Sequence, residues 1–315
     1  MTNIAIRQNN PRNIERQAAA RQIFSDVKVL MGISLFLGVI IPIAISITGF
    51  VLSNGYFGFK KLDISVFSGI AGFFLAVAVE ILNIISVKYR EKGAKILELF
   101  DTEVFGFDWD SVNVGDKPLH DDVFNNKEKF LRKLPFFKQN TLSIFTDWYT
   151  KKASIFSYPK SVVFCQQENL CWDKSLRKDI VYWSTLSLII VLTLVTVLGF
   201  LADYTLVSLF SNVILLIAPI ILFFWKVIAE HKSTVDELTR LRNINEDLVN
   251  KIISNTITND EIIKQAKNLQ TAIYNHRKTA RPIPDWIHKI THSKKELESS
   301  DRVQQYIDTY NSTNP

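Results

Sequence analysis

The sequence contains little cysteine, and this scarcity excludes several classes of protein. Its 315 residues include two cysteines, Cys165 and Cys171. Two thiols separated by a short stretch form neither a disulfide framework nor a complete zinc site. We therefore expect both to be reduced and at least half buried.

Glycine and proline are also scarce, with 11 and 9 residues. The sequence has no internal repeat of fixed period and no low-complexity tract beyond its polar start. No glycine-rich phosphate loop, nucleophile elbow or HExxH pattern occurs, so an enzyme would need an arrangement outside these motifs. His288 and His292 share one helical face, but no third ligand accompanies them, and we interpret them as surface residues. We predict no catalytic residues, no metal and no cofactor.

Four long apolar runs stand out in the rest of the sequence. The run Val29–Leu52 is long enough to cross a hydrocarbon core about 30 Å thick. Three further runs follow, at Ile64–Val87, Ile180–Leu201 and Thr205–Trp225. The short links Ser53–Asp63 and Ala202–Tyr204 join them in pairs. The sequence thus predicts an all-α integral membrane protein with four transmembrane helices in two hairpins.

Basic residues near the ends of these runs indicate the orientation, because Lys and Arg remain in the cytoplasm. Only Lys60 and Lys61 would lie outside, whereas Arg21, Lys28, Lys88, Arg90, Lys92, Lys95, Lys174, Arg177, Lys178, Lys226 and Lys232 would share the other side. This clustering of basic residues beside the spans also accounts for the formal charge of +6. We therefore predict no nucleic-acid binding. The predicted division is a cytoplasmic N-terminal segment (1–28), a transmembrane hairpin (29–87), a cytoplasmic helical region (88–179), a second transmembrane hairpin (180–225) and a cytoplasmic helical hairpin with a tail (226–315).

Helical periodicity continues outside the spans. Span two is predicted to extend as a helix to the break at 105–110, and a polar helix from about residue 159 should run into span three. A short helix is expected at 122–134. Two amphipathic helices, at 227–252 and 260–277, should pair within one chain or between protomers. Two prolines, Pro282 and Pro284, end the second of them, before a short helix and a polar tail.

Two polar residues, Glu80 and Asn83, interrupt span two. A carboxylate in apolar surroundings is costly and tends to face a bundle interior or an aqueous path. Glu80 is therefore a candidate for lining or gating a pore, together with Asn83. Alternatively, Glu80 lies at the cytoplasmic interface, where water, Lys88 or Lys226 would stabilise it. Proline inside spans, as at Pro42, is ordinary in membrane helices.

Three cytoplasmic clusters combine tryptophan with charged and amide side chains. Such a mix can stack a base, hydrogen-bond its edge and neutralise a phosphate. It also makes ordinary caps and buried contacts between helices. The candidate ligand-binding residues are Asp101, Glu103, Trp109, Gln166, Asn169, Trp172, Asp173, Arg177, Arg281, Asp285 and Trp286. Among them, Arg177 and Arg281 would meet phosphates, and the three tryptophans would stack or pack.

The same stretches carry a family resemblance: Leu99–Gly106 with Trp109, Cys165–Asn169 with the Trp172-Asp173 and Leu176-Arg177 pairs, and Ile283–Trp286. With the order of the spans, they resemble the SMODS-associating four-transmembrane effector family, predicted pore formers found beside bacterial cyclic-nucleotide synthases. The resemblance implies a role in anti-phage defence. A cyclic di- or trinucleotide made on infection would bind in the cytoplasm, and the protein would open or assemble a pore in the inner membrane as a homo-oligomer.

Two other functions compete with this hypothesis. The protein could be a non-conducting membrane scaffold that recruits partners through the helical hairpin at Lys226–Arg277. It could also be an enzyme at the membrane interface that acts on lipid, for which His276, His288, His292 and Asp285 would be the active residues.

Overall fold

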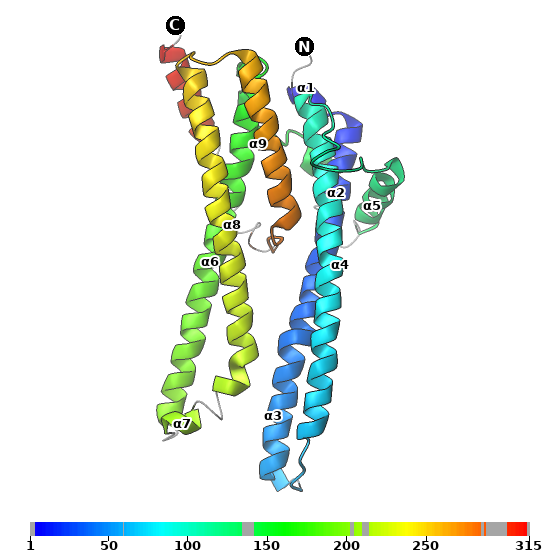
Figure 1. Cartoon of the computed structure of the whole chain (residues 1–315), viewed down its shortest axis with the longest axis vertical. Helices are drawn as coiled ribbons and strands as arrows, with labels where there is room; N and C mark the ends of the chain where they lie inside the picture. Colours follow the sequence, from blue (N-terminus) through cyan, green and yellow to red (C-terminus); the bar gives the residue numbers. More distant parts are fainter. Residues whose placement is uncertain are drawn as a thin grey trace. The chain divides into compact units, whose positions relative to one another are not determined.

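The computed structural model describes residues 4–58, 60–133, 142–201, 205–209, 214–284, 287 and 301–313, and every regular element in these ranges is a helix (Figure 1). The α-helices are α1 (Ile4–Gln8), α2 (Pro11–Leu35), α3 (Ile41–Asn54), α4 (Ser65–Phe105), α5 (His120–Arg132), α6 (Lys160–Leu201), α7 (Leu206–Leu209), α8 (Leu215–Ile253) and α9 (Asn259–Thr279). A π-helix, η1 (Phe36–Ile40), and the 3-10 helices η2 (Tyr56–Gly58), η4 (Leu142–Phe145) and η5 (Lys151–Ile155) complete the set, and residues 301–313 are also helical.

The chain divides into two compact units. The first unit comprises residues 1–27, 87–178 and 233–315, and the second comprises residues 28–86 and 179–232. Helices α2, α4, α6 and α8 each contribute residues to both units. The second unit contains the apolar segments, and we call it the membrane unit; the first we call the polar unit.

The membrane unit consists of helix segments that leave their apolar side chains uncovered. Among the described residues, three helices are long and apolar enough to cross a membrane, lying within 11–49, 65–105 and 160–201. Large side chains such as Phe67 and Phe73 are 68% and 66% exposed. Exposure of such apolar surfaces to water is unfavourable, whereas the hydrocarbon core of a bilayer accommodates them. The predicted all-α membrane protein is therefore confirmed.

The fourth predicted span cannot be followed in full. It covers residues 205–225, of which 210–213 lie outside the described residues, as does the predicted link at 202–204. The described parts of it are α7 and the start of α8, which includes Pro219.

A π-helical turn adapts the first span to its proline. Pro42 is the second residue of α3, and η1 precedes it directly. The amide of Ile41 bonds the carbonyl of Phe36, five residues earlier. Proline cannot donate to a carbonyl four residues back and its ring clashes there, so a widened turn accommodates it. Gly38 in this turn lets α4 approach, because a Cβ there would lie 3.3 Å from Val79.

The polar unit has the main hydrophobic core. Buried side chains from α4, α6, α8 and α9 meet in one cluster, which includes Phe100, Phe164, Leu248 and Ile262. The C-terminal helix 301–313 joins this core through Val303 and Ile307, which the sequence analysis left in a polar tail.

Helices α8 and α9 form an antiparallel pair within one chain (Figure 1). Leu238 and Leu241 of α8 pack with Leu269 and Ile273 of α9, and Leu170 of α6 covers the same cluster. These four residues of the predicted apolar faces are thus buried inside the protomer.

The N-terminal segment corrects the sequence analysis, which treated residues 1–28 as polar and gave them no helix. Helix α2 begins at Pro11, and its residues Ala18, Ala19, Ala20 and Ile23 are buried against α4 and α5. Phe24 lies 3.1 Å from where a Cβ on Gly93 would be, so α2 and α4 are in close contact. Alanine buries little area, and a face of three alanines gives a weak periodic signal.

Candidate functional site

A buried carboxylate, Asp101, organises a polar network in the core of the polar unit. Asp101 lies on α4 and is 1% exposed. Its Oδ1 accepts a hydrogen bond from the Tyr149 hydroxyl at 2.6 Å. Its Oδ2 accepts from Gln270 Nε2 at 3.0 Å and from Arg277 Nη1 at 2.5 Å. Both donors belong to α9, so this carboxylate joins α4, α9 and the segment before η5.

Gln270 links Asp101 to a second buried acid. Its Nε2 also donates to Glu98 Oε2 at 2.8 Å, and Glu98 lies one helical turn before Asp101 on α4. Burial raises the pKa of Glu98 to about 8, and the negative charge of Asp101 adds to the shift. At neutral pH one of the two acids is therefore mainly neutral. Arg277 compensates the other, and the nearby Asp101 raises the pKa of that guanidinium despite burial.

The backbone of Tyr149 is held from the N-terminal helix α1. The Gln8 side chain donates to the Tyr149 carbonyl at 3.2 Å and accepts from its amide at 2.7 Å. Asn169 of α6 donates to the Tyr149 hydroxyl oxygen at 2.8 Å. Tyr149 is thus fixed at both ends, and it brings α6 into contact with Asp101.

Gln166 of α6 extends the network further. Its Nε2 donates to the Gln270 side-chain oxygen at 3.1 Å and to the Ala266 carbonyl at 2.9 Å. Its own Oε1 is buried, with no hydrogen-bond partner within the described residues. Three of the predicted candidates, Asp101, Gln166 and Asn169, therefore belong to a single network.

Asp173 and Arg177 form a second cluster on α6. Arg177 Nε donates to Asp173 Oδ1 at 3.0 Å, and His276 Nε2 of α9 lies 2.5 Å from Asp173 Oδ2. Burial would raise the pKa of Asp173, but Arg177 and His276 hold it well below its usual value. Arg177 also donates to the Arg281 carbonyl at 2.9 Å. The second and third predicted stretches therefore meet through a buried, ion-paired arginine.

The other predicted candidates lie elsewhere. Glu103 pairs with Arg16 at 3.2 Å, and the Trp109 indole donates to the Gly115 carbonyl at 2.8 Å. Trp172 is half buried on α6. Asp285 and Trp286 lie outside the described residues, as do His288 and His292. In the membrane unit, Asn83 donates to Glu80 at 3.5 Å.

Sequence reasoning missed Tyr149, Gln270 and Arg277, which complete the network. A signal for two of them existed, because Gln270 and Arg277 are seven residues apart, the spacing of one helical face. That face also includes the apolar residue Ile273, which packs in the cluster with Leu238 and Leu241. A polar residue within an apolar stripe indicates a buried hydrogen bond.

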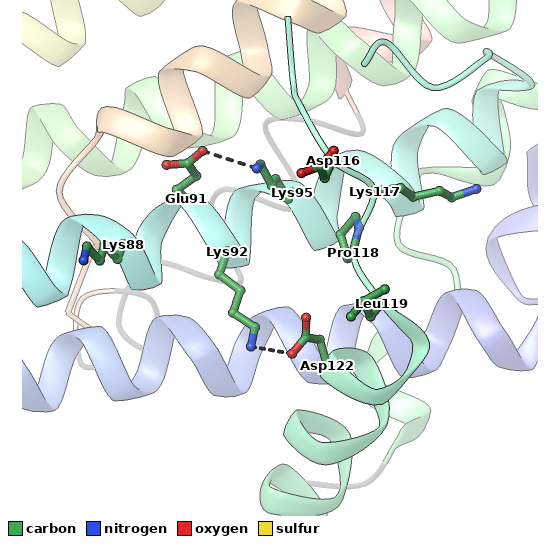
Figure 2. A pocket seen from close by; sticks show the side chains of 9 residues that line it. All are labelled: Lys88, Glu91, Lys92, Lys95, Asp116, Lys117, Pro118, Leu119 and Asp122. Carbon is green, nitrogen blue, oxygen red and sulfur yellow. Dashed lines mark hydrogen bonds and ion pairs between the residues drawn. The ribbon is translucent and has the colours of Figure 1, made fainter. Parts of the chain in front are cut away.

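The polar unit also contains a solvent-accessible pocket of about 310 Å³. Its lining comes from α4, from the loop that precedes α5 and from α5 itself (Figure 2). The residues are Lys88, Glu91, Lys92, Lys95, Asp116, Lys117, Pro118, Leu119 and Asp122. Three of these lysines, Lys88, Lys92 and Lys95, are among the basic residues that indicate the orientation, whereas the pocket itself could not be predicted from the sequence.

Metal binding has no support in the part of the chain that the structure describes, where His, Cys, Asp and Glu form no group of three suited to an ion. Both cysteines are buried and unpaired with each other, and burial raises the pKa of Cys165 well above its usual value. A thiol with a raised pKa is a poor nucleophile and metal ligand.

Comparison with known proteins assigns the family. The profile of the SMODS-associating 4TM effector domain matches residues 2–306. The chain belongs to this family. The match includes the described parts of all three polar stretches, so the predicted family resemblance is confirmed. A relative from Bacillus cereus (strain VD146), described as a probable CBASS effector molecule, is 27% identical over 292 residues, which are 91% of this chain and 92% of the relative. No solved structure matches the chain.

Proposed function

We propose that this protein is an antiviral-defence effector of the bacterial inner membrane that a cyclic nucleotide activates from the cytoplasm and that then permeabilises the membrane. The match of the SMODS-associating 4TM effector profile to residues 2–306 carries the proposal. The relative described as a probable CBASS effector molecule supports it over 91% of the chain. Termini in the cytoplasm and assembly as a homo-oligomer belong to the same proposal.

The arrangement of the polar unit supports a sensing role. Its core contains two acids, a tyrosine, two glutamines and an arginine, contributed by segments far apart in the sequence. The members of such a buried network polarise one another, and an unpaired member is costly, so removing one partner perturbs the others. Because α4, α6 and α8 have residues in both units, a change in this packing acts on the same helices that contain the apolar segments.

The ligand candidates fall into two groups in this proposal. Asp101, Gln166, Asn169, Asp173 and Arg177 act as positioning residues, since each of them already makes at least one hydrogen bond to another part of the protein. Glu103, Trp109, Trp172 and Arg281 remain candidates for direct contact, with Asp285 and Trp286. Glu80 and Asn83 remain candidates for the permeation path, because a carboxylate in a span tends to face other protein or water.

Leakage from liposomes tests the proposal. Purified full-length protein is reconstituted into vesicles loaded with a fluorescent dye, and cyclic di- and trinucleotides are added one at a time. We expect one nucleotide to cause rapid leakage and the others to cause none. Absence of leakage with every member, from folded and inserted protein, would contradict a nucleotide-gated pore and favour a scaffold.

The scaffold has less structural support. It would recruit partners through the helical hairpin at Lys226–Arg277, but Leu238 and Leu241 of α8 pack on α9 and on Leu170 of α6. A partner would have to bind the polar outer face or displace α6.

A further inference from the structure

Three lysines on one face of α4 line the pocket of about 310 Å³ in the polar unit. Lys88, Lys92 and Lys95 follow each other at spacings of four and three residues, which places them on one side of a helix. The opposite wall comes from residues 116–119 and from Asp122 at the start of α5. Figure 2 shows Lys92 reaching across this space to Asp122.

The charges around the pocket are unequal. Lys92 pairs with Asp122 at 2.7 Å and Lys95 with Glu91 at 3.4 Å. Lys278 of α9 also pairs with Glu91, at 3.2 Å. With Lys88 and Lys117, five cations and the three carboxylates Glu91, Asp116 and Asp122 thus lie in or next to the pocket.

The negative charge of Glu91 is already compensated by two of these lysines, Lys95 and Lys278. Burial would raise the pKa of Glu91, but Lys278 and Lys95 lower it below its usual value. Lys88 makes no ion pair within the described residues, and in Figure 2 the Lys117 side chain points away from the other three lysines. Because lysine has a flexible four-carbon stem, Lys117 can turn towards a bound anion.

We infer that this pocket binds a phosphodiester group. Lysine ammonium groups act as point charges for phosphate, and three of them project from one helix face. Pro118 and Leu119 supply an apolar wall suited to a sugar or glycerol carbon skeleton, and no aromatic residue lines the pocket. The pocket therefore suits the backbone of a ligand better than a base.

Two sources can supply this phosphodiester. One is the cyclic nucleotide, and this choice rests on the proposed function. The other is the headgroup of an anionic lipid, because the lysines directly follow the predicted end of span two at Val87, where basic groups attract anionic lipid.

Binding would redistribute the ion pairs around the pocket. A phosphodiester competes with Asp122 for Lys92, in the pair that joins α4 to α5. It also competes with Glu91 for Lys95. The ion pair between Glu91 and Lys278, which joins α4 to α9, changes in consequence. The site thereby couples an anionic ligand to the packing of α4 within the polar unit.

Lysine acetylation read by mass spectrometry tests the inference on full-length protein. One sample is in nanodiscs of phosphatidylcholine alone and receives each cyclic di- or trinucleotide in turn, with binding measured in the nanodiscs and leakage measured in parallel in dye-loaded vesicles. A second sample is in nanodiscs that contain phosphatidylglycerol. We expect one of these phosphodiesters to protect Lys88, Lys92 and Lys95 from acetylation, while Lys264 on α9 is modified equally in all samples.

The variant K88Q/K92Q/K95Q should lose this binding. Each charge-assisted hydrogen bond is worth about tenfold in affinity, so the triple variant should bind at least about a hundredfold more weakly. The matched control K251Q/K264Q/K267Q removes three lysines elsewhere in the polar unit and should bind as the wild type does. Lys88→Gln alone breaks no ion pair among the described residues, so it should fold normally and weaken binding about tenfold.

The outcomes separate this inference from the proposed function. Nucleotide-induced leakage that persists unchanged in the triple variant, with no protection of the three lysines by either phosphodiester, would overturn the inference and leave the proposed function standing. Protection by phosphatidylglycerol alone would support the inference and assign the site to lipid. Wild-type protein that never leaks would contradict the proposed function, and the phosphatidylglycerol sample would still decide whether the pocket binds a phosphodiester.

Discussion

Tyr149 donates its hydroxyl hydrogen to Asp101 across 2.6 Å, and Asn169 donates to the same hydroxyl oxygen at 2.8 Å. The Tyr149 side chain is also packed between Phe100, with ring centroids 6.1 Å apart, and Phe105, with centroids 5.3 Å apart. One side chain thus connects the aromatic core of the polar unit to its buried acid.

Replacement of Tyr149 by phenylalanine tests this connection. The substitution keeps the aromatic packing but removes the donor to Asp101 and the acceptor for Asn169. Leaving buried polar groups unsatisfied costs about 1–3 kcal/mol each, so Tyr149→Phe should lower the melting temperature measurably. Tyr158→Phe, at a half-buried tyrosine of the same core, is the matched control and should have a smaller effect.

The ion pair between Asp101 and Arg277 should behave as a buried pair. Removing Arg277 alone leaves a carboxylate that is 1% exposed without its cation, and we expect Arg277→Met to destabilise the protein by about 3–5 kcal/mol. The double variant Asp101→Asn with Arg277→Met should recover part of that loss. Thermal unfolding of the two single variants and the double variant gives the coupling energy directly. Strict additivity of the two substitutions would contradict the pairing.

An exposed ion pair provides the comparison. Arg240 and Glu237 pair at 2.7 Å on the surface of α8, with side chains 59% and 43% exposed. Arg240→Met should change stability by less than about 1 kcal/mol, because solvent screens such pairs.

Glu98 should make stability depend on pH. Its pKa is raised by burial from 4.5 to about 8, so the folded protein binds a proton more tightly than the unfolded chain. This stabilisation is fully present below about pH 4.5 and is lost as the pH rises through 8, with a slope of up to about 1.4 kcal/mol per pH unit. Melting temperatures between pH 5 and 8 should fall for the wild type and fall less for Glu98→Gln.

Asp173 titrates in the opposite sense and outside this window. Its pKa is lowered, so its contribution to stability is constant between pH 5 and 8 and is lost only in strong acid. An equal pH dependence in the wild type and in Glu98→Gln would therefore exclude Glu98 as its source.

Gly106 ends α4 in a conformation that other residues rarely adopt. Its φ is +74°, and a Cβ would lie 2.5 Å from Arg7 Nη1, which bonds the Val104 carbonyl. Gly106→Ala should cost about 1–2 kcal/mol from the backbone alone, plus the displacement of Arg7. Gly115 has a φ of +81° with its nearest contact, Lys95 Nζ, at 3.4 Å, so Gly115→Ala isolates the backbone part. A larger loss of stability at Gly115 than at Gly106 would refute this account.

Glu80 should affect ion preference if it lines the permeation path. Glu80→Gln removes the charge and keeps a side chain that Asn83 can still contact. We expect the preference for cations over anions in liposome flux to fall several-fold, while activation by ligand is unchanged. Lys61→Gln, in the link between the first two spans, is the control for a general change in surface charge. Identical ion preference in Glu80→Gln and the wild type would place Glu80 outside the path.

The sequence alone determined the membrane class and the extents of most helices. Apolar runs and helical periodicity are properties of neighbouring residues, so the continuation of span two to Phe105, the helix that runs through span three and the helices after Lys226 could be predicted. The alanine-rich start of α2 could not, because its residues are only weakly apolar and become core through the helices that cover them.

Only the tertiary structure decided which polar residues meet. Asp101 was recognised as a candidate, but its cation, Arg277, lies 176 residues away and its tyrosine partner 48 residues away. The lysines of the pocket served as orientation signals in the sequence and became a candidate site only when α5 and the loop before it faced α4. Hydropathy is local along the chain, whereas a charge pair depends on how helices pack, and no single segment encodes that packing.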